Sequence, residues 1–180
     1  MLFELKVFKD VITKLNDNNI PYMISGSVAM NYYTIPRMTR DIDIVVEIGD
    51  IGSFFNAFKK EYYIDQKMVE DAIKNQLMFN IIHLNEVMKI DFIIRKNTEY
   101  RKAEFKRRRQ VNIEGLKVFI VSIEDLIISK LLWAVDSRSE LQVKDVKNLL
   151  KEKIDMDYIT DWLIKLNVSD FFEEIINGRK

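Results

Sequence analysis

The fold is indicated most clearly by residues 20–47, which read IPYMISGSVAMNYYTIPRMTRDIDIVVE. Pro21 keeps the residue before it extended, so we expect a strand to begin here and to end at Gly26-Ser27. Residues 28–33 then predict a short helix. The Ile- and Val-rich residues 41–47 predict a second strand. The stretch therefore predicts strand, glycine turn, helix and strand in close succession.

Three aspartates are candidate metal ligands. Side chains alternate along a strand, so Asp41 and Asp43 point to the same side, with Cα atoms roughly 6.6 Å apart. Asp91 lies in a later apolar run, residues 88–94, where an unpaired charge is costly. A third carboxylate from a second strand would complete a set of hard oxygen ligands suited to Mg²⁺ and a triphosphate. Asp91 could also accept the proton of an attacking hydroxyl.

The glycine turn is a candidate phosphate site. Gly26 has no Cβ, so the backbone can approach a phosphate closely. Ser27 lies at the start of the expected helix, where its hydroxyl and free N–H groups suit an anion. Arg37 and Arg40 either bind phosphate or pair with the aspartates.

Each of these features also has a simpler interpretation. A Gly-Ser turn alone is usually only a turn. An aspartate at the start of a strand is commonly solvated, and Asp91 could form an ion pair with Arg40 or Lys89. We favour the joint metal site because three separate features agree.

Composition excludes several classes of site. The chain has 180 residues and 48% hydrophobic residues, enough for a sizeable core. Its 28 basic and 28 acidic residues give zero net charge, so no global attraction to nucleic acid is expected. The absence of cysteine excludes disulfides and thiolate metal sites, and the single histidine excludes a two-histidine zinc site. No transmembrane run or signal peptide is apparent, so we expect a cytoplasmic protein without a membrane partner.

Hydrophobic spacing and turn signals predict the remaining elements. Helices are expected over 3–15 and 51–62, from a cap at Thr98 through Arg109, and over 126–135, 139–151, 156–166 and 169–177. A hairpin is expected from 77–84 and 87–94, and short strands over 111–113 and 118–121. We therefore predict an α/β (α+β) fold, a mixed sheet flanked by helices. Its core would span 1–122, with a helical C-terminal region, 123–180, packed on it.

The aspartates and the glycine turn resemble a known group. Gly26-Ser27, thirteen further residues and Asp41-Ile42-Asp43, with Asp91 on a later strand, resemble the DNA polymerase β-type nucleotidyltransferase superfamily. Ser25 stands where that superfamily usually has a hydrophobic residue. Residues 37–43, RMTRDID, narrow the resemblance to the branch of AbiE-type toxins and small antibiotic nucleotidyltransferases.

A second block resembles the later lysine and aspartate motifs of those toxins. Residues 122–131 read SIEDLIISKL and are followed by Arg138 and Lys144-Asp145. Without the resemblance, Lys130 could equally be a polar helix position, and Asp145 would be read as solvated surface.

The resemblance implies Mg²⁺-dependent transfer of a nucleoside monophosphate from an NTP such as ATP, with loss of pyrophosphate. Gly26 and Ser27 would hold the β and γ phosphates. One or two Mg²⁺ ions would be bound by Asp41, Asp43 and Asp91. Lys130 would contact the triphosphate, and Asp145 would play the supporting role that this motif has in the toxins.

The motifs do not specify the acceptor or the protein partners. A tRNA, a protein side chain and a small molecule are all compatible with the motifs, and a toxin role would require an antitoxin protein. Six basic side chains within 101–109 are either a solvated face or a patch for RNA. Tyr32 or Tyr33 could stack on a base. The alternatives are a non-catalytic nucleotide- or partner-binding module and a helical interaction protein. The apolar C-terminal helices also fit a homodimer.

Overall fold

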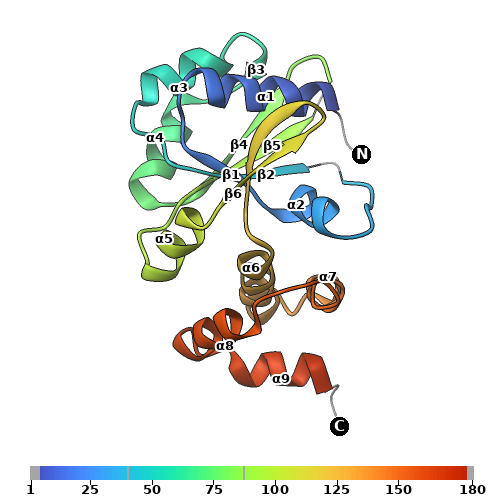
Figure 1. Cartoon of the computed structure of the whole chain (residues 1–180). Helices are drawn as coiled ribbons and strands as arrows, with labels where there is room; N and C mark the ends of the chain where they lie inside the picture. The colour runs from blue at the N-terminus through green and yellow to red at the C-terminus, as the bar shows by residue number, and fades with distance from the viewer. Residues whose placement is uncertain (1–4, 40, 87, 178–180) are drawn as a thin grey trace.

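The protein is described by a computed structural model that covers residues 5–39, 41–86 and 88–177. Within these residues a seven-stranded sheet has the order β3-β4-β5-β2-β1-β7-β6 (Figure 1). The strands are β1 Tyr22–Ile24, β2 Asp41–Val46, β3 Tyr62–Tyr63, β4 Met78–His83, β5 Lys89–Ile94, β6 Arg109–Ile113 and β7 Leu116–Ile120. The mixed sheet and its flanking helices confirm the predicted fold class.

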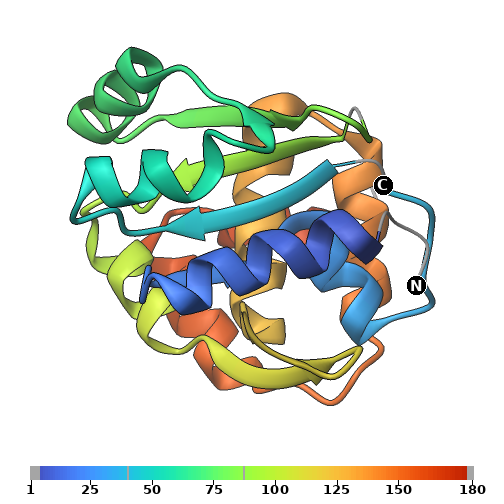
Figure 2. The ribbon, with the colours of Figure 1, turned by 90° about the horizontal axis from the view of Figure 1, so that it is seen from above.

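Helices cover both faces of the sheet. They are α1 Leu5–Asp17, α2 Gly26–Tyr33, α3 Ile51–Phe58, α4 Gln66–Asn75, α5 Glu99–Lys106, α6 Ile123–Ser137, α7 Glu140–Leu149, α8 Met156–Lys165 and α9 Ser169–Asn177. Helices α1, α3 and α4 lie on one face, whereas α2 and α5 lie on the other, with α6 to α9 beyond them (Figures 1 and 2). No helix among the described residues is both long and apolar enough to span a membrane.

Strand pairing places the candidate aspartates side by side. Strand β1 runs antiparallel to β2, and Ser25, just after β1, donates its N–H to the carbonyl of Asp43 at 2.9 Å. Strand β2 runs parallel to β5 in a register that sets Asp43 opposite Asp91. Because side chains at paired positions project to the same face, both carboxylates belong to the face covered by α2 and α5.

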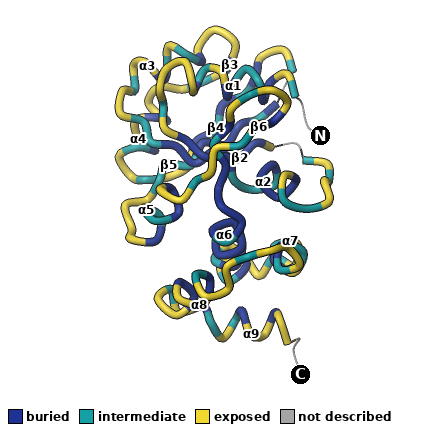
Figure 3. The backbone as a smooth tube through the Cα atoms, viewed as in Figure 1, coloured by how far each residue is buried: buried dark blue, intermediate teal, exposed yellow. Residues whose placement is uncertain are grey.

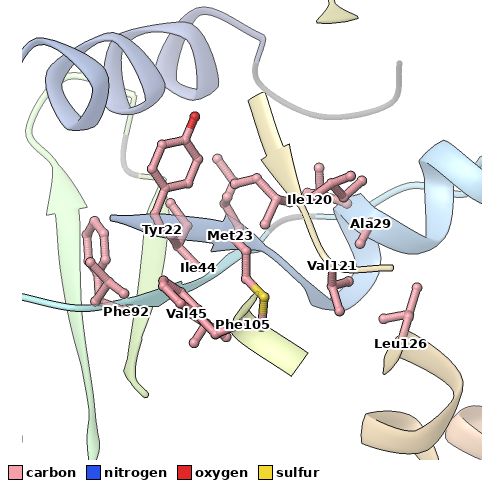
Figure 4. Packing of buried hydrophobic residues seen from close by; sticks show 14 of the residues in the cluster. Tyr22, Met23, Ala29, Ile44, Val45, Phe92, Phe105, Ile120, Val121 and Leu126 are labelled. Carbon is pink, nitrogen blue, oxygen red and sulfur yellow. The ribbon is translucent and has the colours of Figure 1, made fainter. Parts of the chain in front are cut away.

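A continuous hydrophobic core fixes this arrangement. Buried side chains from β1, β2, β5, β7 and the start of α6 belong to this core (Figure 4). On the opposite face Phe54 of α3 meets Phe92 of β5 edge to face, with ring centroids 5.1 Å apart. Helix α6 is buried along most of its length (Figure 3), so it joins the sheet to the C-terminal helices.

Most predicted elements are confirmed, and two regions are wrong. The helix expected from Thr98 to Arg109 ends at Lys106, because Arg109 pairs with Ile120 as the first residue of β6. The helix expected over 51–62 ends at Phe58, because Tyr62-Tyr63 pairs with β4 as a short strand. Helix α4 was not predicted, although Asp65 caps it by accepting the N–H of Met68 at 2.8 Å. The first two residues of the expected 3–15 helix, and Val87 of the hairpin, lie outside the described residues.

The junction between the sheet and the C-terminal helices is a buried polar cluster. Ser122 caps α6, accepting the N–H of Asp125 at 3.2 Å and donating its hydroxyl to the Asp125 carboxylate at 2.7 Å. That carboxylate, which has no exposed surface, also receives Arg107 at 3.1 Å and the Tyr158 hydroxyl at 2.8 Å. Because these partners come from α5, α6 and α8, the cluster joins both parts of the chain. The division at residue 122 stays a prediction.

Candidate active site

The glycine turn lies directly against Asp43. Gly26 begins α2 with φ +57°, a conformation that favours glycine, and a Cβ there would lie 1.8 Å from Oδ2 of Asp43. A hydrogen bond from the Ser27 backbone also reaches the Asp43 carboxylate. The N-terminus of α2 and the second aspartate of β2 therefore form one unit.

The three aspartates occupy neighbouring positions on β2 and β5. Asp41 is exposed, Asp43 is half-buried and Asp91 is only 6% exposed. Lys89 Nζ lies 2.9 Å from Oδ2 of Asp91 and 3.9 Å from Oδ1 of Asp41. The Lys89 ion pair considered from the sequence is therefore present, together with the cluster of carboxylates.

The electrostatics of Asp43 reflect this crowding. Burial, followed by the charges of Asp91 and Asp41, raises the pKa of the Asp43 carboxyl. The Ser27 hydrogen bond and the charge of Lys130 oppose the increase. The ionised form of Asp43 is therefore less favourable than that of a solvated aspartate, and a bound cation would offset this.

The donors fit a metal ion chemically, although no group of three or more His, Cys, Asp or Glu side chains within residues 5–39, 41–86 and 88–177 is arranged to hold one. Oδ1 of Asp91 is buried and has no hydrogen-bond partner. A buried carboxylate oxygen without a partner costs free energy, which a cation would recover. Carboxylate oxygens are the ligands that Mg²⁺ prefers.

A chain of charged side chains links the turn to the C-terminal helices. Arg37 Nη2 lies 3.2 Å from the Ser27 hydroxyl and 3.1 Å from Asp145. Lys130 Nζ donates to the same Oδ2 of Asp145 at 2.8 Å and to Gln142 at 3.1 Å. Lys130 and Asp145 are 5% and 2% exposed. The structure thus brings the two motif residues of α6 and α7 together with Arg37 and Ser27.

A cavity of about 250 Å³ adjoins the turn. Its lining includes Gly26, Ser27, Asp43 and Lys130, so the turn, a candidate metal ligand and the buried lysine face a common space. The cavity also has an apolar part, lined by Val45, Ile93, Leu126 and Trp133.

A polar cluster of α5 and α6 also lines the cavity. Arg101 Nη1 contacts the two oxygens of Glu104 at 3.0 and 2.8 Å, and the Ser129 hydroxyl at 2.6 Å. Ser129 in turn donates to Glu104 at 2.6 Å. Burial raises the pKa of Glu104, and the charge of Arg101 opposes the increase.

Several sequence-predicted residues lie elsewhere. Arg40 falls outside the described residues. Tyr32 and Tyr33 do not line the cavity, and the Tyr33 hydroxyl donates to the carbonyl of Val121 at 2.7 Å. His83 is buried, packs edge to face on Tyr62 and accepts backbone N–H groups with Nδ1, which agrees with a packing role.

The basic segment 101–109 is partly structural. Arg101 pairs with Glu104, Arg107 pairs with Asp125, and Arg108 stacks on Phe105. These three guanidinium groups are engaged within the protein, so they form neither a simple solvated face nor a dedicated RNA patch.

Sequence reasoning missed several residues that line the cavity: Arg101 in this role, Glu104, Ser129, Trp133 and Gln142. Only Trp133 carried a usable signal, because it follows Lys130 by three positions and shares its helix face.

Comparison with known proteins identifies the fold. No protein-family model matches the chain, and no curated protein matches its sequence. The solution structure of the antibiotic-resistance factor ANT(2'')-Ia is similar with a TM-score of 0.61 and 11% identity, covering 96% of this chain and 92% of that one. The crystal structure of ANT(2'')-Ia with adenylyl-2''-tobramycin is similar with a TM-score of 0.56 and 12% identity, and the match covers 93% of this chain and 97% of that one. The crystal structure of an antigenic nucleotidyltransferase-like protein from Paracoccidioides brasiliensis is similar with a TM-score of 0.54 and 18% identity. That match covers 82% of this chain and 76% of the other.

Proposed function

We propose that this chain, which has the fold of the DNA polymerase β-type nucleotidyltransferases, is a Mg²⁺-dependent nucleotidyltransferase. It would move a nucleoside monophosphate from an NTP to an acceptor hydroxyl and release pyrophosphate. The observation that carries the proposal is the glycine turn seated on Asp43, with Lys130 facing the same cavity. Phosphate, metal and a fixed positive charge would thus meet at one point.

The aspartates would hold the metal. The ligands would be Asp41, Asp43 and Asp91, whose unpartnered Oδ1 is available for a cation. When bound, Mg²⁺ supplies charge neutralisation for the transferring phosphoryl group. Asp91 would also accept the proton of the attacking hydroxyl, in line with its position opposite Asp43.

The chain's own cations would orient the triphosphate. The Ser27 hydroxyl and the free N–H groups of α2 suit phosphate oxygens. Lys130 is held at 2.8 Å by Asp145, and Arg37 is held by the same carboxylate at 3.1 Å. We infer that Asp145 positions both cations so that little side-chain entropy is lost when the nucleotide binds.

The apolar part of the cavity suits the nucleoside. Val45 and Ile93 form a wall on the sheet, and Trp133 is a 57% exposed aromatic ring on α6. A nucleobase can stack on such a ring. We therefore place the nucleoside of the NTP beside Trp133.

For the acceptor we favour a small hydroxyl-bearing molecule. A structurally similar protein, ANT(2'')-Ia, has been seen with adenylyl-2''-tobramycin. Internal pairing of Arg101 and Arg107 weakens the case for RNA. A protein or tRNA acceptor, and a toxin role with an antitoxin partner, rest on the sequence resemblance alone.

A labelling assay tests the proposal. Purified protein is incubated with Mg²⁺ and each α-³²P-labelled NTP, with an aminoglycoside and lincosamide panel, total tRNA or cell lysate as acceptor. We expect label transfer that disappears in Asp41→Ala/Asp43→Ala. The matched control is Asp161→Ala, which removes an exposed aspartate of α8.

The outcomes separate an enzyme from a binding module. Transfer by the wild type and by Asp161→Ala supports the enzyme. NTP binding without transfer to any acceptor would favour the non-catalytic module of the same fold. A wild-type protein that neither transfers label nor binds NTP would overturn the proposal.

A further inference from the structure

Lys89 places a fixed positive charge among the candidate metal ligands. The parallel register of β2 and β5 sets Lys89 opposite Asp41, just as it sets Asp91 opposite Asp43. The four side chains therefore project from one face of two adjacent strands. The Lys89 ammonium lies 2.9 Å from Oδ2 of Asp91 and 3.9 Å from Oδ1 of Asp41.

Asp91 uses its two oxygens differently. Oδ2 contacts the Lys89 ammonium, whereas Oδ1 is buried and has no hydrogen-bond partner. A carboxylate has about four lone-pair directions, so Oδ1 retains room for a cation. Asp91 can thus serve one metal ion through Oδ1 without releasing the lysine.

A second metal ion would compete with Lys89. An ion bound by Oδ2 of Asp91 or Oδ1 of Asp41 would occupy the space that the ammonium already approaches. It would also stand within a few ångströms of a like charge, which is unfavourable even near the surface. One divalent ion and one ammonium together neutralise three carboxylates.

We propose that Lys89 takes the place of a second metal ion, so that the site binds one divalent cation per chain. The ammonium would neutralise Asp91 on the side where the acceptor hydroxyl is deprotonated. This inference rests on the proposed function. The competing arrangement is one in which Lys89, whose side chain is 42% exposed, moves into solvent and admits two ions.

Mn²⁺ counting tests the inference without turnover. Full-length protein saturated with an ATP analogue that has a methylene between its α and β phosphates is titrated with Mn²⁺. Free Mn²⁺ is followed by electron paramagnetic resonance. We expect one ion per protein–nucleotide complex for the wild type and for Lys89→Arg, which keeps the charge. Lys89→Met is expected to bind a second ion at least tenfold more tightly than the wild type does.

The controls separate this inference from the function on which it rests. Lys74→Met, which removes an exposed lysine of α4, should bind one ion like the wild type. Two ions on the wild type, or one ion on Lys89→Met, would overturn the role of Lys89 and leave the nucleotidyltransferase proposal standing. Mn²⁺ binding that is absent, or unchanged by Asp43→Asn, would overturn both.

Discussion

Gly26 and Asp43 approach so closely that no side chain fits between them, since a Cβ on Gly26 would lie 1.8 Å from Oδ2 of Asp43. The turn that follows β1 and the carboxylate of β2 are therefore held in one arrangement. A phosphate bound at this helix N-terminus would lie next to a candidate metal ligand, as phosphoryl transfer requires.

Gly26→Ala is expected to damage both stability and nucleotide binding. The positive φ costs a non-glycine residue about 1–2 kcal/mol, and the methyl group would displace the Asp43 carboxylate. Urea denaturation and calorimetry with an ATP analogue measure the two effects. Gly49→Ala is the matched control because nothing lies within 4 Å of its added Cβ. Wild-type nucleotide affinity in Gly26→Ala would contradict this account of the turn.

Asp43→Asn is expected to stabilise the metal-free protein while abolishing transfer. The pKa of Asp43 is raised in the folded state, so the folded protein holds the Asp43 proton more tightly than the unfolded chain does. Ionised Asp43 therefore costs stability at neutral pH, and this cost disappears as the pH falls through the raised pKa.

Thermal melts without divalent cations measure this effect. Asp43→Asn should melt above the wild type near neutral pH, and the difference should shrink toward about pH 4. Mg²⁺ should raise the melting temperature of the wild type more than that of the variant. A variant that is less stable than the wild type at neutral pH would show that the carboxylate is compensated already.

Asp145→Ala is expected to lower the free energy of unfolding by about 3–5 kcal/mol, because it removes the partner of a buried lysine. Lys130 loses its 2.8 Å contact and Arg37 loses its 3.1 Å contact. Urea denaturation measures the loss. If the two residues act as a pair, Lys130→Met combined with Asp145→Ala should cost less than the sum of the single changes. Strict additivity would mean that the contact contributes nothing.

Trp133→Ala is expected to weaken NTP binding about tenfold, the order of magnitude of one stacked base. Stability should change little, since the ring is 57% exposed. Calorimetry with an ATP analogue measures the affinity. Ile164→Ala, which truncates a 61% exposed side chain on α8, is the control. An unchanged affinity in Trp133→Ala would place the nucleoside elsewhere.

Local sequence signals were sufficient for the central unit of the fold. Pro21, Gly26 and the alternating aspartates act within a few residues, so β1, α2 and β2 could be predicted. Strand β3 could not, because Tyr62-Tyr63 becomes a strand only by pairing with His83 and Ile82 of β4. Such pairing over some twenty residues leaves no local pattern.

The neighbouring placement of Asp43 and Asp91 could be anticipated because side chains alternate regularly along strands, whereas their role as metal ligands stays a prediction. The supporting role expected of Asp145 was suggested by resemblance alone, because its contacts with Lys130 and Arg37 join segments far apart in the chain. Glu104 looked like a surface residue between basic neighbours. It is 1% exposed because Arg101 and Ser129 satisfy its carboxylate.

The buried Asp125 cluster bears on how substrates enter. Swinging the C-terminal helices away from the sheet would separate this carboxylate from Arg107 of α5 or from Tyr158 of α8. Breaking a buried charged pair costs about 3–5 kcal/mol, so an opened form would be populated in fewer than about one molecule in a hundred. The C-terminal helices are therefore held in one position against the sheet, and a nucleotidyltransferase of this structure would choose among acceptors by shape and charge rather than by closing around them.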